Sequence, residues 1–495
     1  MEKTAIDGGT PVREKKLFYG HQYIDDADIK AVEEVLRSDF LTCGPKIEEL
    51  EKKLCELTGA KYAVVCSNGT AALHMACQAA GITEGDEVIT TPITFAASAN
   101  CALYCGARPV FADINERTYN IDPASVEEHV TEHTKAVVAV DFTGQAVELD
   151  RLTALCKEKG LVLIEDGAHS IGTRYNGRSV GSIADMTTFS FHPVKTVTGG
   201  EGGAVLTNSK EYYDRLVLYR AHGITRIPAF MKRESEGPWY YEQVALGMNY
   251  RMTDIQAALI ISQLDKLSLF RKRRKEIVEK YNEAFLRIPE ITVQEEIPES
   301  DTTRHLYILR IKPEMLTIDR KQFFAAMAAE NICCNVHYIP VYRHPYYEEL
   351  GYEKGLCPKA EKLYEDIMRH GDIATGFDYP VKVNGRYIMS PSPIPRFDNP
   401  KMHQCPALQL FGAGREKRIY AIPPYTDVVS LDFEDYPFTP QSWDQCCAIC
   451  GATDTYLDEI VMDDAGTRMF VCSDTDNCAR RVAGQGGTAA PREEK

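Results

Sequence analysis

Three groups of polar residues in the first half of the sequence follow apolar segments that have the length of buried strands. Ser67–Thr70 joins one such segment to a helical pattern. Asp166 follows the apolar segment Leu161–Ile164. Lys195 follows Thr187–Phe191 and precedes a glycine-rich segment. Because ligands in open α/β sheets bind beyond the carboxyl ends of the strands, we expect the three groups to meet at one edge of a sheet.

A lysine, a carboxylate and a phosphate-binding turn are the groups that pyridoxal phosphate requires. The lysine forms an imine with the cofactor and later moves a proton between carbons, while the carboxylate keeps the pyridine nitrogen protonated. The N–H groups and the dipole at the start of a helix suit the phosphate. Phe95 is available to cover the ring. These residues predict a pyridoxal-phosphate site with Lys195 as its reactive amine.

Each feature alone also has a structural explanation. A lysine after a strand is often solvated, and an aspartate at a strand end commonly caps a helix. Ser67–Thr70 could form a simple turn. The prediction therefore depends on the three features occurring together and in this order.

Four cysteines near the end of the sequence have the spacing of a metal site. Cys447 and Cys450 form a Cys-x-x-Cys pair, and Cys472 and Cys478 follow it. Four thiolates suit zinc or an iron–sulfur cluster, and the spacing does not choose between them. The alternative is a set of unlinked buried thiols. Cys405 and Cys446 lack clear spacing and are not expected to be ligands.

The elements that must position these residues alternate between strand and helix patterns from Lys61 to about Asn208. This alternation predicts an α/β fold with a mostly parallel sheet flanked by helices. A helix is expected at Thr70–Ala80, and strands at Tyr62–Val65, Asp86–Ile89, Ala136–Val140 and Leu161–Ile164.

A long helical pattern, Asp254–Glu283, leads to a second and smaller α+β domain, with strands expected at Tyr307–Ile311 and Cys333–Tyr338. After about Ile373 the helical periodicity is poor. In Ser390–Pro395 every second residue is proline, which blocks regular backbone hydrogen bonding. The expected organisation is a large cofactor-binding domain at 1–250, a small domain at 251–362, a loop-rich fragment at 363–482 and a disordered tail at 483–495.

The composition narrows the class of protein. A net charge of −16 argues against a general nucleic-acid binder or a protein of acidic membrane surfaces. The start, Met1–Thr4, leads into no apolar segment of the kind found in signal peptides. No apolar segment is long enough to span a bilayer. The cysteines before residue 360 are scattered singly, which indicates reduced thiols and not a framework of disulfides. A cytoplasmic enzyme is expected.

The first part of the sequence, from about Ile6 to Asp366, resembles the DegT/DnrJ/EryC1/StrS sugar aminotransferases. This resemblance implies a fold-type I pyridoxal-phosphate transferase that forms a homodimer with active sites at the subunit interface. It is carried by the motifs Phe189–Lys195 with the following Gly199–Gly203, Glu165–Ser170, Gly44-Pro45, Ser67–His74, Thr91–Phe95 and Gly247–Met252.

The resemblance also implies a role for individual residues. Lys195 would be the imine lysine, Asp166 would bind the ring nitrogen, and His169 would lie near the ring. Phe95 would stack on the ring. Asn249 would reach the phosphate of the neighbouring subunit, although the sequence alone favours a helix cap at this position. The phosphate would be held by Gly69, Thr70 and Ser190.

The segment Val336–Tyr342, with His344–Tyr347, is similar to members of this family in the pseudaminic acid pathway. That similarity implies glutamate as the amino donor and a UDP-linked 4-keto-6-deoxy N-acetyl sugar as the acceptor. Core packing of the small domain is a competing explanation for this aromatic segment, and related sugars share the same scaffold.

From Lys362 onward the sequence resembles the C-terminal half of the carbon–phosphorus lyase catalytic subunit of phosphonate metabolism. The resemblance implies a 4Fe-4S cluster on the four cysteines that cleaves S-adenosylmethionine, a thiyl radical at Cys478, and a ribose 1-methylphosphonate 5-phosphate substrate. The matching segments are Tyr379–Tyr387, Pro391–Pro400, Pro406–Arg418 and Phe470–Asp476.

The sequence departs from both families near Lys362–Ile367, a segment that both share in similar form. The N-terminal half of the lyase, including its glycine-rich segment, is missing, so lyase activity is not expected. The small aminotransferase domain lacks the strand and helix that usually close it. The chain is therefore expected to be a chimera, of natural or artificial origin. A structural metal-binding appendage is the alternative function for its second part.

Overall fold

The computed structural model separates the chain into two compact units, residues 1–371 and 372–495, and each is described by itself. The first unit holds the α/β fold and the small domain that follows it. The structure describes residues 3–366, 381–383, 386–388, 409–412, 419–422, 428–430, 446–452, 457–461, 468–472, 478 and 481–482.

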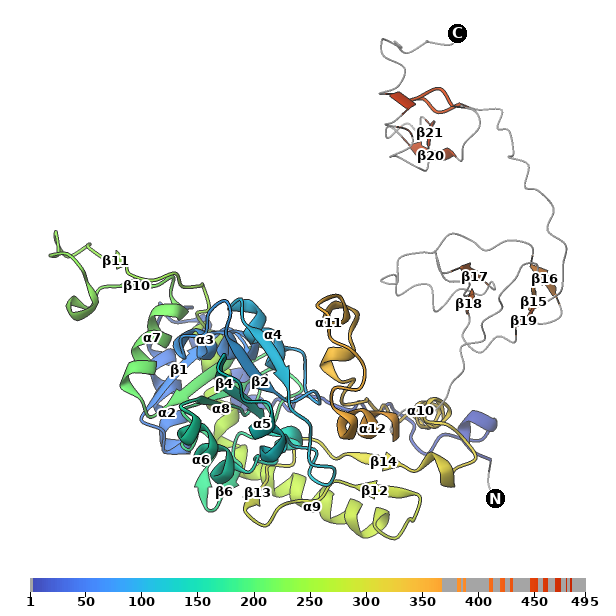
Figure 1. Cartoon of the computed structure of the whole chain (residues 1–495), viewed down its shortest axis with the longest axis horizontal. Coiled ribbons are helices and arrows are strands. Elements are labelled where there is room, and N and C mark those ends of the chain that lie inside the picture. The colour runs from blue at the N-terminus through green and yellow to red at the C-terminus, as the bar shows by residue number, and fades with distance from the viewer. Residues whose placement is uncertain are drawn as a thin grey trace. The chain divides into compact units, whose positions relative to one another are not determined.

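A seven-stranded sheet forms the centre of the first unit (Figure 1). Only β9 runs antiparallel to its neighbours, so the prediction of a mostly parallel sheet is confirmed. In spatial order, the strands are β1 (Tyr62–Cys66), β9 (Gly203–Thr207), β8 (Met186–Ser190), β5 (Val162–Asp166), β4 (Thr134–Val140), β2 (Glu87–Thr90) and β3 (Arg108–Phe111).

Successive side chains of each strand point to opposite faces of this sheet, and helices cover and bury both faces. Ala63 and Val65 pack into one hydrophobic cluster, and Val64 and Cys66 pack into another. The first cluster is covered by α2 (Pro45–Thr58), α6 (Leu149–Lys159) and α8 (Asp254–Asp265), and the second by α3 (Gly69–Ala79), α4 (Ala97–Tyr104) and α7 (Lys210–Arg220).

The predicted strands of the seven-stranded sheet lie within one or two residues of the observed ones, whereas the predicted helix Asp254–Glu283 is two helices. The chain leaves α8 at Lys266 and continues as α9 (Leu267–Phe285). Lys266 donates to Asp25, which precedes α1 (Asp26–Leu36), and to Asp28 within it. Because the sequence has no proline or glycine at this break, only the tertiary contact marks it.

The small domain contains one two-stranded antiparallel sheet of β12 (Ile291–Val293) and β14 (Leu309–Ile311). The prediction of a strand at Cys333–Tyr338 is wrong. Leu17 forms a bridge with Ile332, just before this segment, and none of the described strands pairs with the segment itself. The helices that follow β14 are α10 (Arg320–Ala329), α11 (Pro345–Glu349) and α12 (Pro358–Asp366).

The helix α12 is fixed to the large domain, whereas α10 is not buried. Asp113 accepts hydrogen bonds from the backbone N–H groups of Lys359 and Ala360 at the start of α12, both at 2.9 Å. In contrast, α10 has no buried residue, although Phe323 and Phe324 lie in it. The two aromatic side chains of α10 are therefore half-buried.

Short additional elements complete the first unit. The helix α5 (Pro123–Glu128) packs on α6, and β13 (Ser300–Asp301) pairs with β6 (Arg174–Tyr175), which pairs with β7 (Arg178–Ser179). The hairpin of β10 (Ile224–Thr225) and β11 (Glu242–Gln243) extends away from the sheet (Figure 1). No helix in the described part of the chain is long and apolar enough to cross a membrane.

The second unit consists, in its described parts, of short antiparallel strands. The expected disordered tail and the proline-rich segment lie outside the described residues. The strands are β15 (Val381–Val383), which pairs with β16 (Arg386–Ile388) and β19 (Val428–Ser430); β17 (Gln409–Gly412), which pairs with β18 (Ile419–Ile422); and β20 (Leu457–Val461), which pairs with β21 (Arg468–Cys472).

A pair of fully buried carboxyl groups lies where β4 and β5 end. Asp141 and Glu165 are both 0% exposed, and the charge of Glu165 disfavours the ionised form of Asp141. Ser170 Oγ donates to Asp141 at 2.6 Å, and Thr187 Oγ1 donates to Glu165 at 2.8 Å. Burial raises the pKa of both groups, that of Glu165 to about 7.

This pair predicts a fall in stability as the pH rises. The pKa of Glu165 is about 7 in the folded protein and about 4.5 in an exposed carboxyl group, so the unfolded chain loses its proton first. The free energy of unfolding should therefore decrease between about pH 4.5 and pH 7, by roughly 2–4 kcal/mol for such a shift. Urea unfolding across this range should show a smaller decrease for Glu165→Gln than for the parent. The exposed control Glu158→Gln should follow the parent, and identical profiles for all three proteins would contradict the assignment.

Candidate active site

The predicted phosphate-binding turn, Ser67–Thr70, lies where β1 leads into α3, and is called the phosphate cradle below. Asn68 caps the helix, and its side chain accepts a hydrogen bond from the backbone N–H of Ala71 at 2.8 Å. The N–H groups of Gly69 and Thr70 bond no other described residue and line the cavity next to Ser190. A Cβ atom at Gly69 would lie 2.8 Å from the Cβ of Ser190, so only glycine leaves this space open. The arrangement suits a phosphate group.

Asp166 is the last residue of β5 and is held by polar neighbours. Its carboxylate accepts hydrogen bonds from Ser98 Oγ at 2.7 Å and from the N–H of Ala168 at 3.1 Å. The hydroxyl groups of Ser98 and Thr94 lie 2.8 Å apart. Burial raises the pKa of Asp166, while these hydrogen bonds and the charge of Lys195 oppose the rise. A cationic ring nitrogen at this place would favour the ionised carboxylate.

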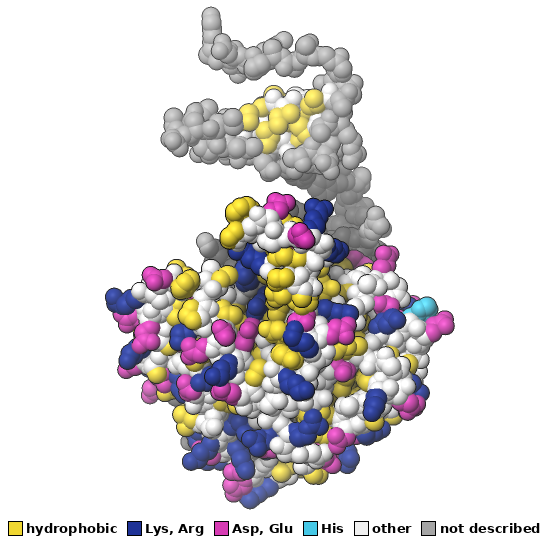
Figure 2. All heavy atoms as spheres, turned by 90° about the vertical axis from the view of Figure 1, so that its left-hand side faces the viewer, with side chains coloured by type: hydrophobic (Ala, Val, Ile, Leu, Met, Phe, Trp, Pro, Cys, Tyr) yellow, Lys and Arg dark blue, Asp and Glu magenta, His cyan; other side chains and the backbone are white. Residues whose placement is uncertain are grey.

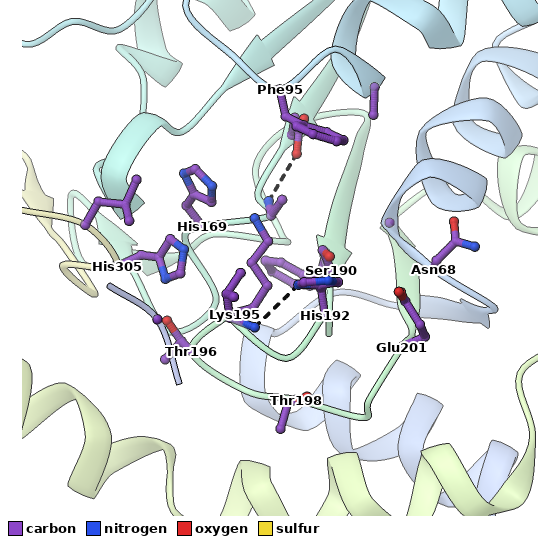
Figure 3. Close-up of a pocket in the computed structure, with 18 of the residues that line it drawn as sticks. Asn68, Phe95, His169, Ser190, His192, Lys195, Thr196, Thr198, Glu201 and His305 are labelled. Carbon is purple, nitrogen blue, oxygen red and sulfur yellow. Dashed lines mark hydrogen bonds between the residues drawn. The ribbon is translucent and has the colours of Figure 1, made fainter. Parts of the chain in front are cut away.

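Lys195 extends into the centre of the cavity from the turn that follows β8 (Figure 3). The N–H of Lys195 donates to the carbonyl of His192 at 2.9 Å, which closes this turn. Burial lowers the pKa of the Lys195 amine to about 8, and the charge of Asp166 opposes this effect. A minor fraction of the amine, far larger than for an ordinary lysine, is therefore uncharged near neutral pH and able to act as a nucleophile.

Two histidines lie on one side of Lys195, opposite Asn68 and Ser190 (Figure 3). The rings of His169 and His305 are 4.5 Å apart, and the Nδ1 atoms of both are buried without a hydrogen-bond partner. Burial lowers the pKa of both rings, and the nearby charge of Lys195 adds to this effect. Both rings are neutral near pH 7 and offer polar atoms to a ligand.

The cavity has a volume of about 1500 Å³, which exceeds that of ordinary small-molecule pockets and leaves room for a cofactor beside a large substrate. Phe95 lies at its edge and is 65% exposed. Asn249 is exposed, does not line this cavity and does not cap α8, because Thr253 is the cap. The structure brings together all the other residues predicted for the cofactor: Gly69, Thr70, Phe95, Asp166, His169, Ser190 and Lys195.

Sequence reasoning missed Ser98 and His305. Ser98 lies at the start of α4 and Thr94 precedes this helix, so their spacing of four residues gives no helical signal. His305 has no local signal either, since it meets His169 from a distant part of the sequence. These residues, the unbonded N–H groups of the cradle and the buried amine together fit pyridoxal phosphate.

The four predicted cysteine ligands also lie together, in the second unit. Cys447, Cys450, Cys472 and Cys478 are buried, and all four sulfur atoms lie within 4.8 Å of one another. The N–H of Cys472 donates to the sulfur of Cys447 at 3.2 Å. Burial raises the pKa of Cys447, but the backbone N–H groups facing its sulfur outweigh burial and bring it to about 6. Cys446 is exposed, and Cys405 lies outside the described residues.

Two family models match consecutive parts of the chain. Residues 22–371 match the DegT/DnrJ/EryC1/StrS aminotransferase family, and residues 354–484 match the phosphonate metabolism protein PhnJ. The two matches overlap only at residues 354–371, next to the predicted junction. The prediction that the chain is a chimera of these two families is confirmed.

Individual relatives match the first part. The chain is 39% identical over 335 residues to a UDP-4-amino-4,6-dideoxy-N-acetyl-beta-L-altrosamine transaminase of Campylobacter jejuni, covering 67% of this chain and 86% of the relative. PseC of Helicobacter pylori, an aminotransferase involved in the biosynthesis of pseudoaminic acid, has a TM-score of 0.65 at 34% identity, covering 71% and 92%. The PLP form of the putative sugar aminotransferase Spr1654 of Streptococcus pneumoniae has a TM-score of 0.65 at 31% identity, covering 70% and 91%.

The family match covers every residue that the sequence predicted for the cofactor. The buried lysine, the carboxylate and the phosphate cradle lie at the carboxyl ends of strands in the matched part. The chain therefore belongs to the DegT/DnrJ/EryC1/StrS family and is a pyridoxal-phosphate-dependent sugar aminotransferase that carries a segment matching PhnJ at its C-terminal end.

Proposed function

We propose that the protein transfers an amino group from glutamate to a UDP-linked 4-keto-6-deoxy N-acetyl sugar. The observation that carries the reaction type is the buried Lys195 amine beside Asp166 and the N–H cradle in one cavity. The substrate class is supported by the similarity to an altrosamine transaminase and by the volume of the cavity, which has room for a nucleotide-linked sugar. Glutamate is proposed from the resemblance of the sequence.

The proposed roles of the residues follow from their positions. When bound, the cofactor supplies an electron-withdrawing ring that stabilises negative charge on the reacting carbon. Lys195 would attach the cofactor and carry the proton between carbons. Asp166, fixed by Ser98, would face the ring nitrogen. Phe95 and His169 would lie beside the ring, and the phosphate would be held by Gly69, Thr70 and Ser190.

We also propose that the active protein is a homodimer. The hairpin of β10 and β11 and the residues just after it expose large apolar side chains: Trp239 is 69% exposed in the hairpin, and Leu246 is 76% exposed after it. Figure 2 shows a strip of hydrophobic side chains on the face that this hairpin occupies. Asn249 lies close after the hairpin and outside its own cavity, which supports a contact with the phosphate of a second subunit. Exposed apolar surface of this kind marks interfaces.

For the second unit we propose a single structural zinc ion. A tetrahedral site with Zn–S bonds of about 2.3 Å places its sulfur atoms about 3.8 Å apart. The sulfur atoms of Cys447 and Cys478 are 3.7 Å apart, and those of Cys450 and Cys472 are 3.4 Å apart. This spacing supports one ion and does not fit the four irons and four sulfides of a 4Fe-4S cluster. The second unit would then be a structural metal module.

The amino transfer itself is tested with the purified holoenzyme, glutamate and a UDP-linked 4-keto-6-deoxy N-acetyl sugar. Formation of the amino sugar and of 2-oxoglutarate is expected, and Lys195→Ala should lower the rate at least about 10²–10⁴-fold, the range for loss of a positioned acid–base group. Mass spectrometry of the sugar product measures this. No amino sugar from the parent, or equal rates for the parent and Lys195→Ala, would contradict the proposal.

The lowered pKa of Lys195 predicts how the apo protein captures the cofactor. Only the uncharged amine attacks the aldehyde, so the capture rate should rise with pH around a midpoint near 8, and not near the 10.5 of an ordinary lysine. Asp166→Asn should move the midpoint lower, because the Asp166 charge raises the pKa of Lys195. Stopped-flow absorbance measures the rate, and a midpoint above 10 would contradict this environment.

The cradle predicts a selective defect in Gly69→Ala. The added methyl group would meet the Cβ of Ser190 at 2.8 Å and its Oγ at 3.0 Å, where the phosphate is expected. The affinity for pyridoxal phosphate should fall roughly 10- to 100-fold, as for a lost hydrogen bond to a charged group. Alanine favours a helix over glycine, so the helix itself should persist. Pyridoxal, which has no phosphate, is the control: an equal loss for both ligands would contradict the assignment.

The cysteine cluster predicts about one zinc per chain and no acid-labile sulfide. Cys447→Ser should lose most of this zinc, whereas Cys446→Ser is the matched control because Cys446 is exposed and lies outside the cluster. Both variants should retain amino transfer. Metal analysis with a sulfide assay measures the composition, and about four irons with sulfide in the parent would overturn the zinc assignment.

A further inference from the structure

The wall of the cavity contains a guanidinium group that the proposed chemistry does not use. Arg274 lies on α9 and lines the cavity. Its Nη1 atom donates to the carbonyl oxygens of Arg304 at 3.2 Å and of His305 at 2.9 Å. The other two nitrogens of the guanidinium group, Nε and Nη2, donate no hydrogen bond to any residue in the described part of the chain.

The charge of Arg274 also has no counter-ion. Burial alone lowers its pKa, and none of the carboxylates in the described ranges forms an ion pair with it. The preceding residue on the helix behaves differently: Arg273 also lines the cavity, but it is exposed and pairs with Glu276 at 2.9 Å. A partly buried guanidinium without an anion is unfavourable, so a ligand that brings an anion would be favoured at Arg274.

His305 extends the same part of the wall. Its side chain is 8% exposed and lines the cavity, and its buried Nδ1 atom has no hydrogen-bond partner. Burial lowers the pKa of the ring, and the charges of Lys195 and Arg274 act in the same direction. The neutral ring therefore leaves a polar nitrogen without a partner on the residue whose backbone carbonyl accepts a hydrogen bond from Arg274. The described carboxylates that line the cavity are Asp166, which is bonded to Ser98, and Glu201.

We propose that Arg274 and His305 form an oxyanion-binding subsite of the active-site cavity, which takes a carboxylate or phosphate group of a substrate. A planar guanidinium with two free donors matches the two oxygens of such a group. Two substrates could supply it: the amino donor through a carboxylate, and the nucleotide sugar through its diphosphate. This inference rests on the proposed function, because it names the group that orients a substrate in that site.

The test compares equilibrium binding of two unreactive ligands, UDP and 2-oxoglutarate, to the holoenzyme by calorimetry. Arg274→Gln should weaken one of them roughly 10- to 100-fold, the range for hydrogen bonds to a charged group. Arg274→Lys, which keeps the charge but loses the planar guanidinium, should give a smaller loss. Arg273→Gln is the matched control and should stay within about threefold of the parent for both ligands. Loss for UDP assigns the subsite to the diphosphate, and loss for 2-oxoglutarate assigns it to the donor.

Affinities of Arg274→Gln within about threefold of the parent for both ligands would overturn the subsite. If this variant does not fold, as judged by circular dichroism, Arg274→Met keeps the aliphatic stem and replaces it. A crystal structure of the parent with either ligand bound, with no oxyanion against Arg274 in either complex, would overturn it as well. The binding measurements and the crystal structure do not depend on turnover. A failure of amino transfer would therefore contradict the proposed function, whereas the binding results alone decide whether the subsite exists.

Discussion

The burial of one amine beside one carboxylate is the constraint on which the chemistry of this protein depends. Lys195 follows β8 and Asp166 ends β5, and these strands are neighbours in the sheet. Strand pairing therefore fixes where the turn that carries Lys195 begins relative to Asp166, and the hydrogen bond from the N–H of Lys195 to the carbonyl of His192 closes that turn. Burial lowers the pKa of the amine to about 8, and the opposing charge of Asp166 keeps it from falling further. The site thus holds a nucleophile that is partly uncharged at neutral pH.

The end of β5 places two consecutive carboxyl groups on opposite faces of the sheet, because side chains alternate along a strand. Asp166 faces the cavity and is bonded to Ser98, while Glu165 points to the other face, where Thr187 donates a hydrogen bond to it. A buried carboxyl group is unfavourable unless it is hydrogen-bonded or protonated. Asp166 is stabilised by hydrogen bonds, whereas burial raises the pKa of Glu165 and favours its protonated form. The backbone that carries Asp166 is thereby held from both sides.

The parts of the fold and site that sequence could predict are those with a local signal. Apolar segments marked the strands, a polar turn before a helical pattern marked Gly69 and Thr70, and Cys-x-x-Cys spacing marked the cysteine cluster. His305 and the break at Lys266 depend on contacts between residues far apart in sequence, which leave no local pattern. The segment Cys333–Tyr338 has the composition of a strand but pairs with none of the described strands, so composition misled the assignment there.

The central claim is that Lys195 binds the cofactor covalently, and it can be tested directly. Reduction of the holoenzyme with borohydride, followed by digestion and mass spectrometry, fixes the cofactor to the lysine that holds it. The account predicts a single modified peptide, with the cofactor on Lys195 and none on the exposed lysines of the surface. A modification on another lysine, or no modified peptide from a protein that binds pyridoxal phosphate, would contradict it.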